Sequence, residues 1–479
     1  MNSSARATPA MLRQLEDELA LPPFRGIHLG ATIINSLVIE LYVGNGDWSW
    51  KARLKNHLRR LRYGWFPQRR RRREPLYAGR RILVTLSSPN YRGYNLVRPV
   101  IEALGPEQSF VLCGSRELPA DMPAEAADWS QVMDYDVAAW RAEYNRCKVP
   151  WRAVARRWSH IHRMPPGVCD RIVLYLMLSS QGTDGCLAFL RQHRPSAIVV
   201  EFDRHGLWSC LILAAKSLGI PTFTLVHGVL NEEAVGYVPL LADKAFCWGE
   251  MSRRQFLAAG EVQEKLLVAG CPRLERKLRA APAEAKRKLG LADGKPVVML
   301  GTMPVRRMES QSLAAMFCDA VEKSGRVQGL VRLHPSEKLM DYADAMRRFP
   351  AVRFSANAET TLDESLSAAD LVVVHSSGLG SDALVAGRPV VVARLPNLPL
   401  GHAAELIEIA HCPAASTAYE LAAAIDELLF DATRRQEQLA AAERYVGDFC
   451  AAFGPDAARR IAETVHQTAQ RTNNCGDSQ

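Results

Sequence analysis

Two short polar motifs in the second half of the chain each accompany the end of an apolar run. Residues 332–337 (RLHPSE) overlap the end of the run 329–333 (GLVRL), and residues 375–384 (HSSGLGSDAL) follow the run 371–374 (LVVV). Both runs are predicted to be buried parallel strands. The carboxyl ends of such strands lie at one edge of a sheet, so the two motifs are expected to meet there. Imidazole, hydroxyl and helix-start N–H groups donate hydrogen bonds to anions, which predicts a site for a phosphate-bearing ligand.

The second motif is a predicted turn from a strand into a helix. The hydroxyls of Ser376 and Ser377 and the first N–H groups of the helix would face a ligand above the strand, and Gly378 would let the backbone come close to it. Asp382 lies one turn into the helix, where it is expected to accept hydrogen bonds from ribose hydroxyls. The alternative is that Ser376 only caps the helix.

The first motif adds an imidazole at the same edge. His334 follows its strand directly and Pro335 fixes the turn after it, so that a donor imidazole can contact a phosphate or diphosphate. Glu337 is expected either at the ligand or at the start of the next helix, where a carboxylate is favourable. A single histidine after a strand is more often structural, so this prediction depends on its pairing with the serine motif.

The elements that must position these motifs form two alternating blocks. Short apolar runs alternate with helical patterns, which is typical of α/β proteins with parallel sheets. The predicted strands are 81–86, 109–113, 197–201, 222–226, 244–248 and 265–270 in the first block, and 297–301, 329–333, 352–354, 371–374 and 390–393 in the second. Two Rossmann-like domains facing a cleft are therefore expected. The expected divisions are a basic appendage over residues 1–75, an N-terminal domain over 76–285 and a C-terminal domain with closing helices over 286–479.

The positive charge of the chain is concentrated in one segment. The net charge is +9, and residues 51–81 hold thirteen basic side chains and one acid, which leaves the rest of the chain at a net −3. A nucleic-acid-binding surface is not expected, because the basicity does not extend over the protein. Residues 48–73 also contain three tryptophans and a phenylalanine, which favours contact with an anionic membrane surface. A solvated basic helix and an Arg-rich linker are the alternative.

Cysteine usage and hydropathy bear on location. The eleven cysteines are scattered without a CxxC pair, which predicts buried free thiols in a reducing cytosol and neither a zinc nor a redox site. No secretory signal is recognised, and the most apolar early stretch, Ala31 to Val43, is interrupted by Glu40 and too short to span a membrane. A cytoplasmic protein, peripheral on the inner face of the membrane where the basic segment touches it, is expected.

The two motifs together resemble the C-terminal halves of bacterial GT-B glycosyltransferases that build capsules and lipopolysaccharide. The HP and SS pairs are similar to those of the bacterial sialyltransferase and polysialyltransferase groups, in which the histidine and serines hold the nucleotide phosphate. The resemblance is best over residues 195–395 and implies a nucleotide-sugar substrate, such as a CMP- or UDP-sugar, with no cofactor. The matching positions are His334, Pro335, Ser376 and Ser377, with Asp382 at the position of a ribose-binding glutamate and Gly301-Thr302 similar to the donor-facing loop.

The resemblance further implies an inverting transfer, commonly without a metal, that needs a general base. The acidic motif that carries the base in the sialyltransferases has no intact copy here, since residues 232–234 read EEA and residues 363–365 read DES. The base is therefore sought in the first block. The candidates, each just after a predicted strand, are Glu201, Asp203 and His227, although a carboxylate beside Arg204 and His205 is as readily an ion pair.

Polar and aromatic residues in the predicted loop 87–95 suit the hydroxyls of an acceptor sugar, as a generic loop also would. These candidate acceptor contacts are Asn90, Tyr91, Tyr94 and Asn95.

Three other functions remain open. Non-hydrolysing nucleotide-sugar 2-epimerases share the fold, but they have Ser-Gly-Gly and then Gln-Glu-Glu where this chain has Ser-Ser-Gly and the single acid Asp382. Polyol-phosphate transferases of the teichoic-acid type have His-Gly-Thr where residues 227–229 read HGV. The third is an inactive GT-B scaffold bound to the membrane. The motifs favour transfer of a sugar to a surface polysaccharide or glycolipid.

Overall fold

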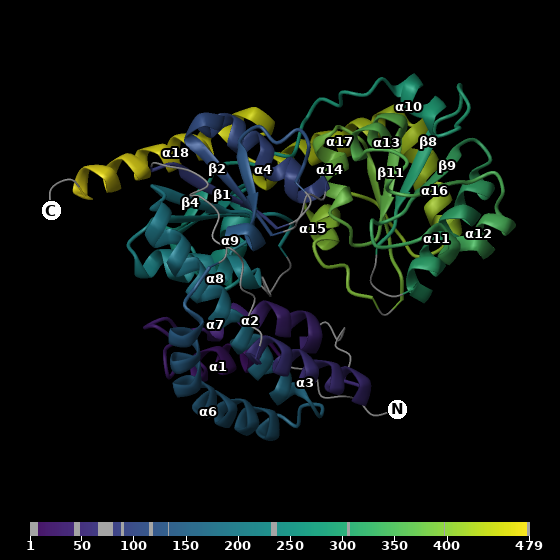
Figure 1. Cartoon of the computed structure of the whole chain (residues 1–479). Coiled ribbons are helices and arrows are strands. Elements are labelled where there is room, and N and C mark those ends of the chain that lie inside the picture. Colours follow the sequence, from purple (N-terminus) through teal and green to yellow (C-terminus); the bar gives the residue numbers. More distant parts are fainter. Residues whose placement is uncertain are drawn as a thin grey trace.

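The structure, a computed structural model, describes residues 8–42, 48–65, 80–87, 91–114, 118–132, 134–230, 237–303, 307–396 and 398–476. Two lobes, each built on a parallel sheet, make up most of it (Figure 1). A layer of helices lies below the N-terminal sheet in that view, and the C-terminal lobe lies to its right.

The N-terminal sheet has seven parallel strands in the order β3-β2-β1-β4-β5-β6-β7. Each of β1, β2, β4 and β5 is buried throughout, as apolar runs covered on both faces should be. The order reverses direction between β1 and β4, so a crevice for a ligand is expected above their carboxyl ends. The strands are β1 (Ile82–Leu86), β2 (Ser109–Cys113), β3 (Glu125–Asp128), β4 (Ala197–Val200), β5 (Thr222–Leu225), β6 (Lys244–Cys247) and β7 (Leu266–Val268).

The C-terminal sheet has six parallel strands in the order β10-β9-β8-β11-β12-β13, with the corresponding reversal between β8 and β11. The predicted α/β class with two Rossmann-like domains is confirmed. The strands are β8 (Val297–Gly301), β9 (Gln328–Arg332), β10 (Arg353–Ser355), β11 (Leu371–Val374), β12 (Val390–Ala393) and β13 (Ala414–Ala415). The helices between and after them include α11 (Arg307–Ser324), α13 (Leu362–Ala368), α14 (Leu379–Val385), α15 (Ala403–Glu408) and α16 (Ala418–Phe430).

The helical layer joins the start of the chain to the N-terminal domain. Where the sequence predicts an appendage over residues 1–75, Leu15, Phe24 and Ile33 are buried in the same apolar cluster as Trp158 and Leu211. An amphipathic helix is stable only when its apolar face is covered, which is why α1 and α2 pack onto the domain. The helices of the layer are α1 (Pro9–Glu18), α2 (Gly30–Leu37), α3 (Trp50–Trp65), α6 (Val137–Ile161) and α7 (Val168–His193), and α8 (Gly206–Ser217) joins them to the sheet.

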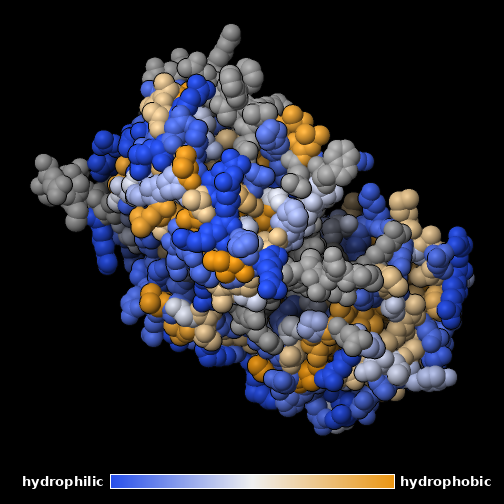
Figure 2. Space-filling model, turned by 90° about the horizontal axis from the view of Figure 1, so that it is seen from below, coloured by the Kyte–Doolittle hydropathy of each residue, from blue (hydrophilic) through white to orange (hydrophobic). Residues whose placement is uncertain are grey.

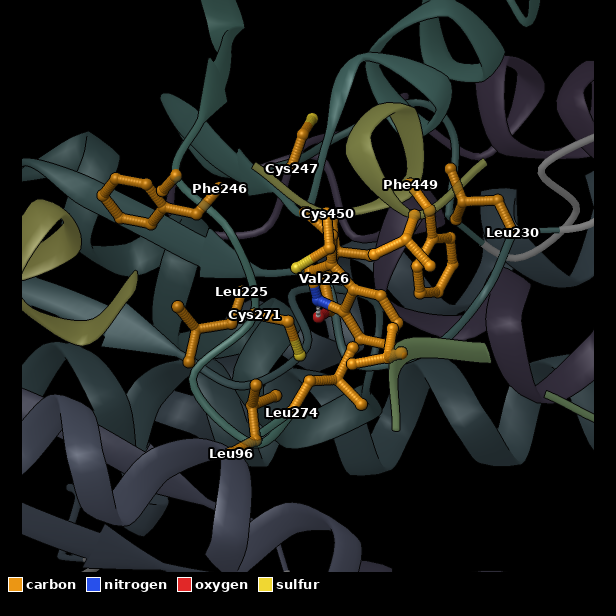
Figure 3. Packing of buried hydrophobic residues seen from close by; sticks show 14 of the residues in the cluster. Leu96, Leu225, Val226, Leu230, Phe246, Cys247, Cys271, Leu274, Phe449 and Cys450 are labelled. Carbon is orange, nitrogen blue, oxygen red and sulfur yellow. Dashed lines mark hydrogen bonds between the residues drawn. The ribbon is translucent and has the colours of Figure 1, made fainter. Parts of the chain in front are cut away.

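The chain crosses back to the N-terminal domain near its end. Helix α17 (Ala432–Phe449) belongs to the C-terminal lobe, and α18 (Gly454–Gly476) packs on α4 (Tyr91–Leu104) of the other lobe. We call residues 248–249, 270–271 and 449–454 the crossover, because their backbones bond directly: Cys271 N–H donates to the Ala452 carbonyl (2.9 Å). Figure 3 shows Cys271, Phe449 and Cys450 in one apolar cluster with Val226 from the N-terminal sheet.

The cysteines and the helices agree with two simpler expectations. The ten cysteines whose side chains the structure describes are free, and nine of them are buried, which confirms the predicted buried thiols. Among the helices of the described part of the chain, none combines the length and the apolarity needed to cross a membrane.

Candidate functional site

The end of β8 lies between the ends of β9 and β11 and contacts both. Thr302 Oγ1 accepts a hydrogen bond from the backbone N–H of His334 (2.8 Å), and Ser376 Oγ donates to the sulfur of Met303 (3.2 Å). The strand order β9-β8-β11 thus brings the histidine motif and the serine motif to one edge of the sheet, on either side of Thr302 and Met303. Gly301 ends β8, and a Cβ there would stand 2.3 Å from a side-chain carbon of Leu379, so the position admits only glycine without repacking.

The His334 ring has a defined tautomer in its neutral form. Its Nδ1 lies 2.9 Å from Ser336 Oγ and accepts a hydrogen bond from the backbone N–H of Ser336 (3.3 Å). Because Nδ1 is an acceptor, the proton of the neutral ring is on Nε2. The ring is partly exposed at the edge of the sheet, beside the exposed Pro335, and supplies an N–H donor of the kind that an anion needs.

Glu337 is engaged inside the same loop. Its Oε2 accepts from the backbone N–H of His334 (3.1 Å) and from the Thr302 hydroxyl, and its Oε1 accepts from the Tyr342 hydroxyl (2.7 Å). Burial and this bond raise the pKa of Tyr342 well above its ordinary value. With three donors on one carboxylate, Glu337 braces the backbone that carries His334.

The serine turn faces the other domain. Ser377 Oγ accepts from the N–H of Leu379 at the start of α14 (3.3 Å). Burial lowers the pKa of His402, which is partly offset by a hydrogen bond of its ring to the backbone of Ser377. A Cβ on Gly378 would lie 3.6 Å from a methyl carbon of Val229, which belongs to the loop after β5. The serine turn and that loop therefore meet at the boundary between the two domains.

Asp382 sits in the first turn of α14, and both of its carboxylate oxygens are bound. Arg273, which follows β7 in the N-terminal lobe, donates to them at 3.1 and 3.2 Å. Both side chains are less than a tenth exposed, and the Arg273 guanidinium lies 5.2 Å from the ring centroid of Trp248. A ribose would have to compete with this pair for the carboxylate, so we interpret Asp382 as a link between the domains.

Glu201 follows β4, beside the reversal point of the N-terminal sheet. Burial raises the pKa of its carboxyl group, and hydrogen bonds from the Ser87 hydroxyl and backbone oppose that shift only in part. Ser87 Oγ in turn accepts from Trp208 Nε1 (2.7 Å). The other carboxylate oxygen, Oε2, is buried and has no hydrogen-bond partner among the described residues. A raised pKa and an unengaged oxygen at such a point are features of groups that transfer protons.

Asp203, two residues further on, has a different environment. It is buried, and one carboxylate oxygen accepts hydrogen bonds from the backbone N–H groups of Leu241 (2.7 Å) and Ala242 (3.0 Å). These bonds fix the segment before β6 to the end of β4. The neighbouring Arg204 pairs with Glu16 of α1 rather than with Asp203 (3.2 Å).

His227 lies at the end of β5, just before the loop that meets the serine turn. Its ring stacks on Tyr237 with an interplanar angle of 21°, and its Nε2 lies 3.3 Å from the Tyr237 hydroxyl. Phe202 packs against the same ring, with centroids 4.5 Å apart. The imidazole is thus held in an aromatic pair at the domain boundary.

The predicted acceptor loop is partly helical. Helix α4 begins at Tyr91, so Tyr94 and Asn95 lie in its first two turns, while Asn90 is outside the described residues. The Tyr94 hydroxyl donates to the Asp121 carbonyl (2.8 Å) and lies 3.0 Å from its carboxylate. These contacts fix the first turn of α4 to the segment before β3.

Sequence reasoning missed Met303, Val229, His402 and Arg273 at this boundary. Met303, Val229 and Arg273 each follow a predicted strand by a few residues, which is a signal for the sheet edge that could have been used. His402 lies further along the loop after the strand 390–393, and its distance from that strand in the sequence gives no indication that it lies at the sheet edge. In the described part of the chain, no three His, Cys, Asp or Glu side chains gather as they would around a metal ion. The side chains beside β8 are hydroxyls and an imidazole, which can donate hydrogen bonds.

Comparison with known proteins supports the fold. No protein-family model and no curated protein matches the chain. It is similar to a UDP-N-acetylglucosamine 2-epimerase structure at 13% identity and a TM-score of 0.52, with 81% of this chain and 95% of that chain covered. It is also similar to the UDP-GlcNAc 2-epimerase from Neisseria meningitidis bound to UDP-GlcNAc, at 14% identity and a TM-score of 0.53, with 81% of this chain and 100% of that chain covered. A glycosyltransferase from Rickettsia africae is similar at 11% identity and a TM-score of 0.50, with 82% of this chain and 99% of that chain covered. At these identities the likeness concerns the fold, which is of the GT-B type.

Proposed function

We propose that this protein is a glycosyltransferase that moves a sugar from a nucleotide-sugar donor to a surface-polysaccharide or glycolipid acceptor. The C-terminal domain binds the donor, with the diphosphate or phosphate between His334 and the serine turn. The N-terminal domain binds the acceptor. One of the similar structures, the UDP-GlcNAc 2-epimerase from Neisseria meningitidis, is bound to UDP-GlcNAc, which supports a nucleotide-sugar partner of this kind.

One observation carries the donor site: Thr302 and Met303 contact the two phosphate-binding motifs from the strand between them. In this arrangement an anion above β8 would receive the Nε2–H of His334 from one side and, when the Ser376 hydroxyl turns away from Met303, the hydroxyls of Ser376 and Ser377 from the other. The crevice above a strand-order reversal is also where open α/β sheets bind their ligands. Seen from below, the surface is hollowed where the two lobes meet (Figure 2).

For the chemical step we propose an inverting, metal-independent transfer with Glu201 as the general base. Oε2 of Glu201 takes the proton of the acceptor hydroxyl, whose oxygen forms a bond to the anomeric carbon of the donor sugar. The bond from that carbon to the phosphate oxygen breaks, and the electron pair leaves with the nucleotide. His334 and the serine hydroxyls stabilise the charge that develops on the phosphate. Asp203 and His227 serve as structural supports in this scheme.

The pH dependence of turnover tests the role of Glu201. A base must be deprotonated, so the rate is expected to rise with pH through the pKa of Glu201, which burial holds above its ordinary value of 4.5. Ser87→Ala removes a hydrogen bond that favours the charged carboxylate, so the acidic limb should move to higher pH. Glu201→Gln should lower turnover by roughly 100-fold or more while nucleotide binding is kept. An unchanged acidic limb in both variants would exclude Glu201 as the base.

A nucleotide-sugar 2-epimerase is the second candidate, because two of the three fold neighbours above carry that name. The two functions differ in their products. We would incubate the full chain with CMP- and UDP-sugars and a glycolipid acceptor, and measure both the released nucleotide and the stereochemistry of the sugar. The proposal expects nucleotide release without a 2-epimer. A 2-epimer without nucleotide release would favour the epimerase. If no donor gave either turnover or thermal stabilisation, the inactive scaffold would be the remaining function.

We also propose that the basic helix α3 holds the protein at the inner face of the membrane. Leu54 and Leu58 are 50% and 56% exposed, one helical turn apart, among exposed residues that include Lys51, Lys55 and Arg59. Exposed leucines beside basic side chains suit an anionic bilayer surface. Such a location would bring the enzyme to the lipid-linked or membrane-bound acceptors of capsule and lipopolysaccharide synthesis.

Vesicle binding tests this location. The wild type is expected to sediment with vesicles that contain anionic lipid and far less with neutral vesicles, and Leu54→Ser with Leu58→Ser should reduce binding several-fold. The matched control is Val149→Ser with Ile161→Ser, since these residues are 67% and 58% exposed on α6 of the same layer. Equal loss in the two double variants would contradict a specific role of α3.

A further inference from the structure

The helical layer of the N-terminal domain contains a cavity of about 350 Å³ between α2, α7 and α8, which lie side by side in Figure 1. Its size falls within the range of small-molecule pockets. The lining includes Ile33, Leu178 and Leu207, with Trp129 at one wall, and none of its residues carries a charge. A neutral and largely apolar group is therefore the kind of ligand that it fits.

The sequence of α7 breaks the ordinary helix pattern at this cavity. Residues 179–185 (SSQGTDG) are all buried, although they are polar or small and lie in the middle of a long helix. Ser180 accepts from Trp140 Nε1 (2.9 Å), and Asp184 pairs with Arg25. Ser179, Gln181 and Gly182, by contrast, line the cavity. Violations of local sequence rules in an otherwise regular element are expected at functional sites.

The cavity is connected to the proposed base through helix α8. Gly206 and Leu207 line it from the first turn of α8, which begins a few residues after Glu201. The next residue, Trp208, bonds Ser87, which bonds Glu201. Trp129 comes directly after β3, so the cavity opens among elements that end at the same edge of the sheet. A group bound in it would be attached close to an acceptor hydroxyl at Glu201.

The cavity also adjoins the basic helix. Helix α3 packs on α7, whose residues Tyr175 and Leu178 line the cavity. Glu40, on the π-helical segment Val38–Tyr42 that continues α2, accepts from the Tyr175 hydroxyl (2.7 Å) and pairs with Arg171, so its charge is balanced outside the lining. The basic helix α3 thus packs on the same helix, α7, that forms one wall of the uncharged pocket.

From this arrangement we propose that the cavity holds the hydrocarbon chain of a lipid-linked acceptor, which rests on the function proposed above. The basic residues of α3 attract the anionic lipid surface, and the pocket between α2, α7 and α8 takes the first part of the chain. The head sugar then lies at Glu201. The acceptor class is accordingly a phospholipid-type or isoprenoid-linked saccharide.

Calorimetric titration with farnesyl phosphate below its micellar concentration tests the proposal. Ser36 lines the cavity from α2 and is partly exposed, so Ser36→Phe should obstruct it and weaken binding at least tenfold. Ser36→Leu should give a smaller loss. The matched control is Asn35→Phe, since Asn35 is the partly exposed neighbour that does not line the cavity, and it should bind as the wild type does. Inorganic phosphate alone should not bind at the same concentration.

Thermal stabilisation by UDP and CMP is measured on the same variants and should be unchanged, which shows that they are folded and that the donor site is intact. Farnesyl phosphate that binds Ser36→Phe as tightly as the wild type would overturn the proposal. So would a wild type that binds glucose but not farnesyl phosphate, because the cavity would then be a sugar site. If UDP and CMP did not stabilise the wild type, the proposed function would be refuted instead. Failure of the lipid proposal and failure of the proposed function are therefore distinguishable.

Discussion

Replacing Gly270 with alanine is expected to lower the free energy of unfolding by at least about 3 kcal/mol. Gly270 has a φ of +100°, and a Cβ there would stand 2.2 Å from the carbonyl oxygen of Ala452. The atom that the Cβ would meet belongs to the backbone, and the adjacent Cys271 N–H donates a hydrogen bond to that same carbonyl. Neither of these two segments of the crossover can therefore move without losing a hydrogen bond. Thermal unfolding, or soluble yield if the variant does not fold, provides the measurement.

Gly290→Ala is the matched control for Gly270→Ala. Gly290 has a φ of +68°, and a Cβ there would meet nothing within 4 Å, so only the backbone cost of about 1 kcal/mol is expected. Gly249→Ala separates the two causes, since Gly249 has no positive φ but its Cβ would lie 2.3 Å from the Asp448 carbonyl. Equal stability of Gly270→Ala and Gly290→Ala would contradict the packing of the crossover described here.

Asp382→Ala is expected to cost roughly 3–5 kcal/mol, because it leaves the Arg273 guanidinium buried without its carboxylate. The pair joins α14, which carries the serine turn, to the segment after β7 in the other lobe. Loss of the pair should therefore also weaken nucleotide binding. The measurement is thermal unfolding with and without UDP.

The same segment after β7 also forms an exposed ion pair, which serves as a matched control. Arg276 and Glu443 are 47% and 62% exposed at 2.7 Å, so Arg276→Ala should change stability by less than about 1 kcal/mol. In the double variant Arg273→Met with Asp382→Leu, no unpaired charge remains, and much of the stability should return. If Asp382→Ala were no more damaging than Arg276→Ala, the pair would not be the link between the domains.

All strands of the two sheets except the edge strands β3 and β13 followed from the sequence, as did the sheet edge proposed for the donor site, because buried parallel strands leave a strong local signal. The run 371–374 and its serine turn, for example, needed only the pattern of apolar residues and glycines to be placed at the end of a strand. The position of Asp382 in the first turn of a helix could be read in the same way.

The partners of these residues depended on contacts between distant parts of the chain. Nothing near Asp382 indicates that Arg273 binds it across 109 positions, and nothing near Asp203 indicates the two N–H groups of residues 241 and 242. The predicted appendage over residues 1–75 also depends on distant contacts. The apolar face of α1 packs in one cluster with helices that lie more than a hundred residues away in the sequence. Tertiary packing, which no local pattern records, decided all three.

The central claim is that His334 and the serine turn hold the phosphate of a nucleotide, and thermal unfolding with and without UDP or CMP tests it most directly. At a concentration of roughly 100 times Kd, a nucleotide should stabilise the wild type by about 2.7 kcal/mol. His334→Ala should weaken binding roughly 10- to 100-fold, the effect of one hydrogen bond to a charged group, and so reduce the stabilisation at the same concentration to between about 1.4 and about 0.4 kcal/mol. The exposed His160 of α6 provides the control His160→Ala, which should retain it. Stabilisation of His334→Ala equal to that of the wild type would contradict the claim.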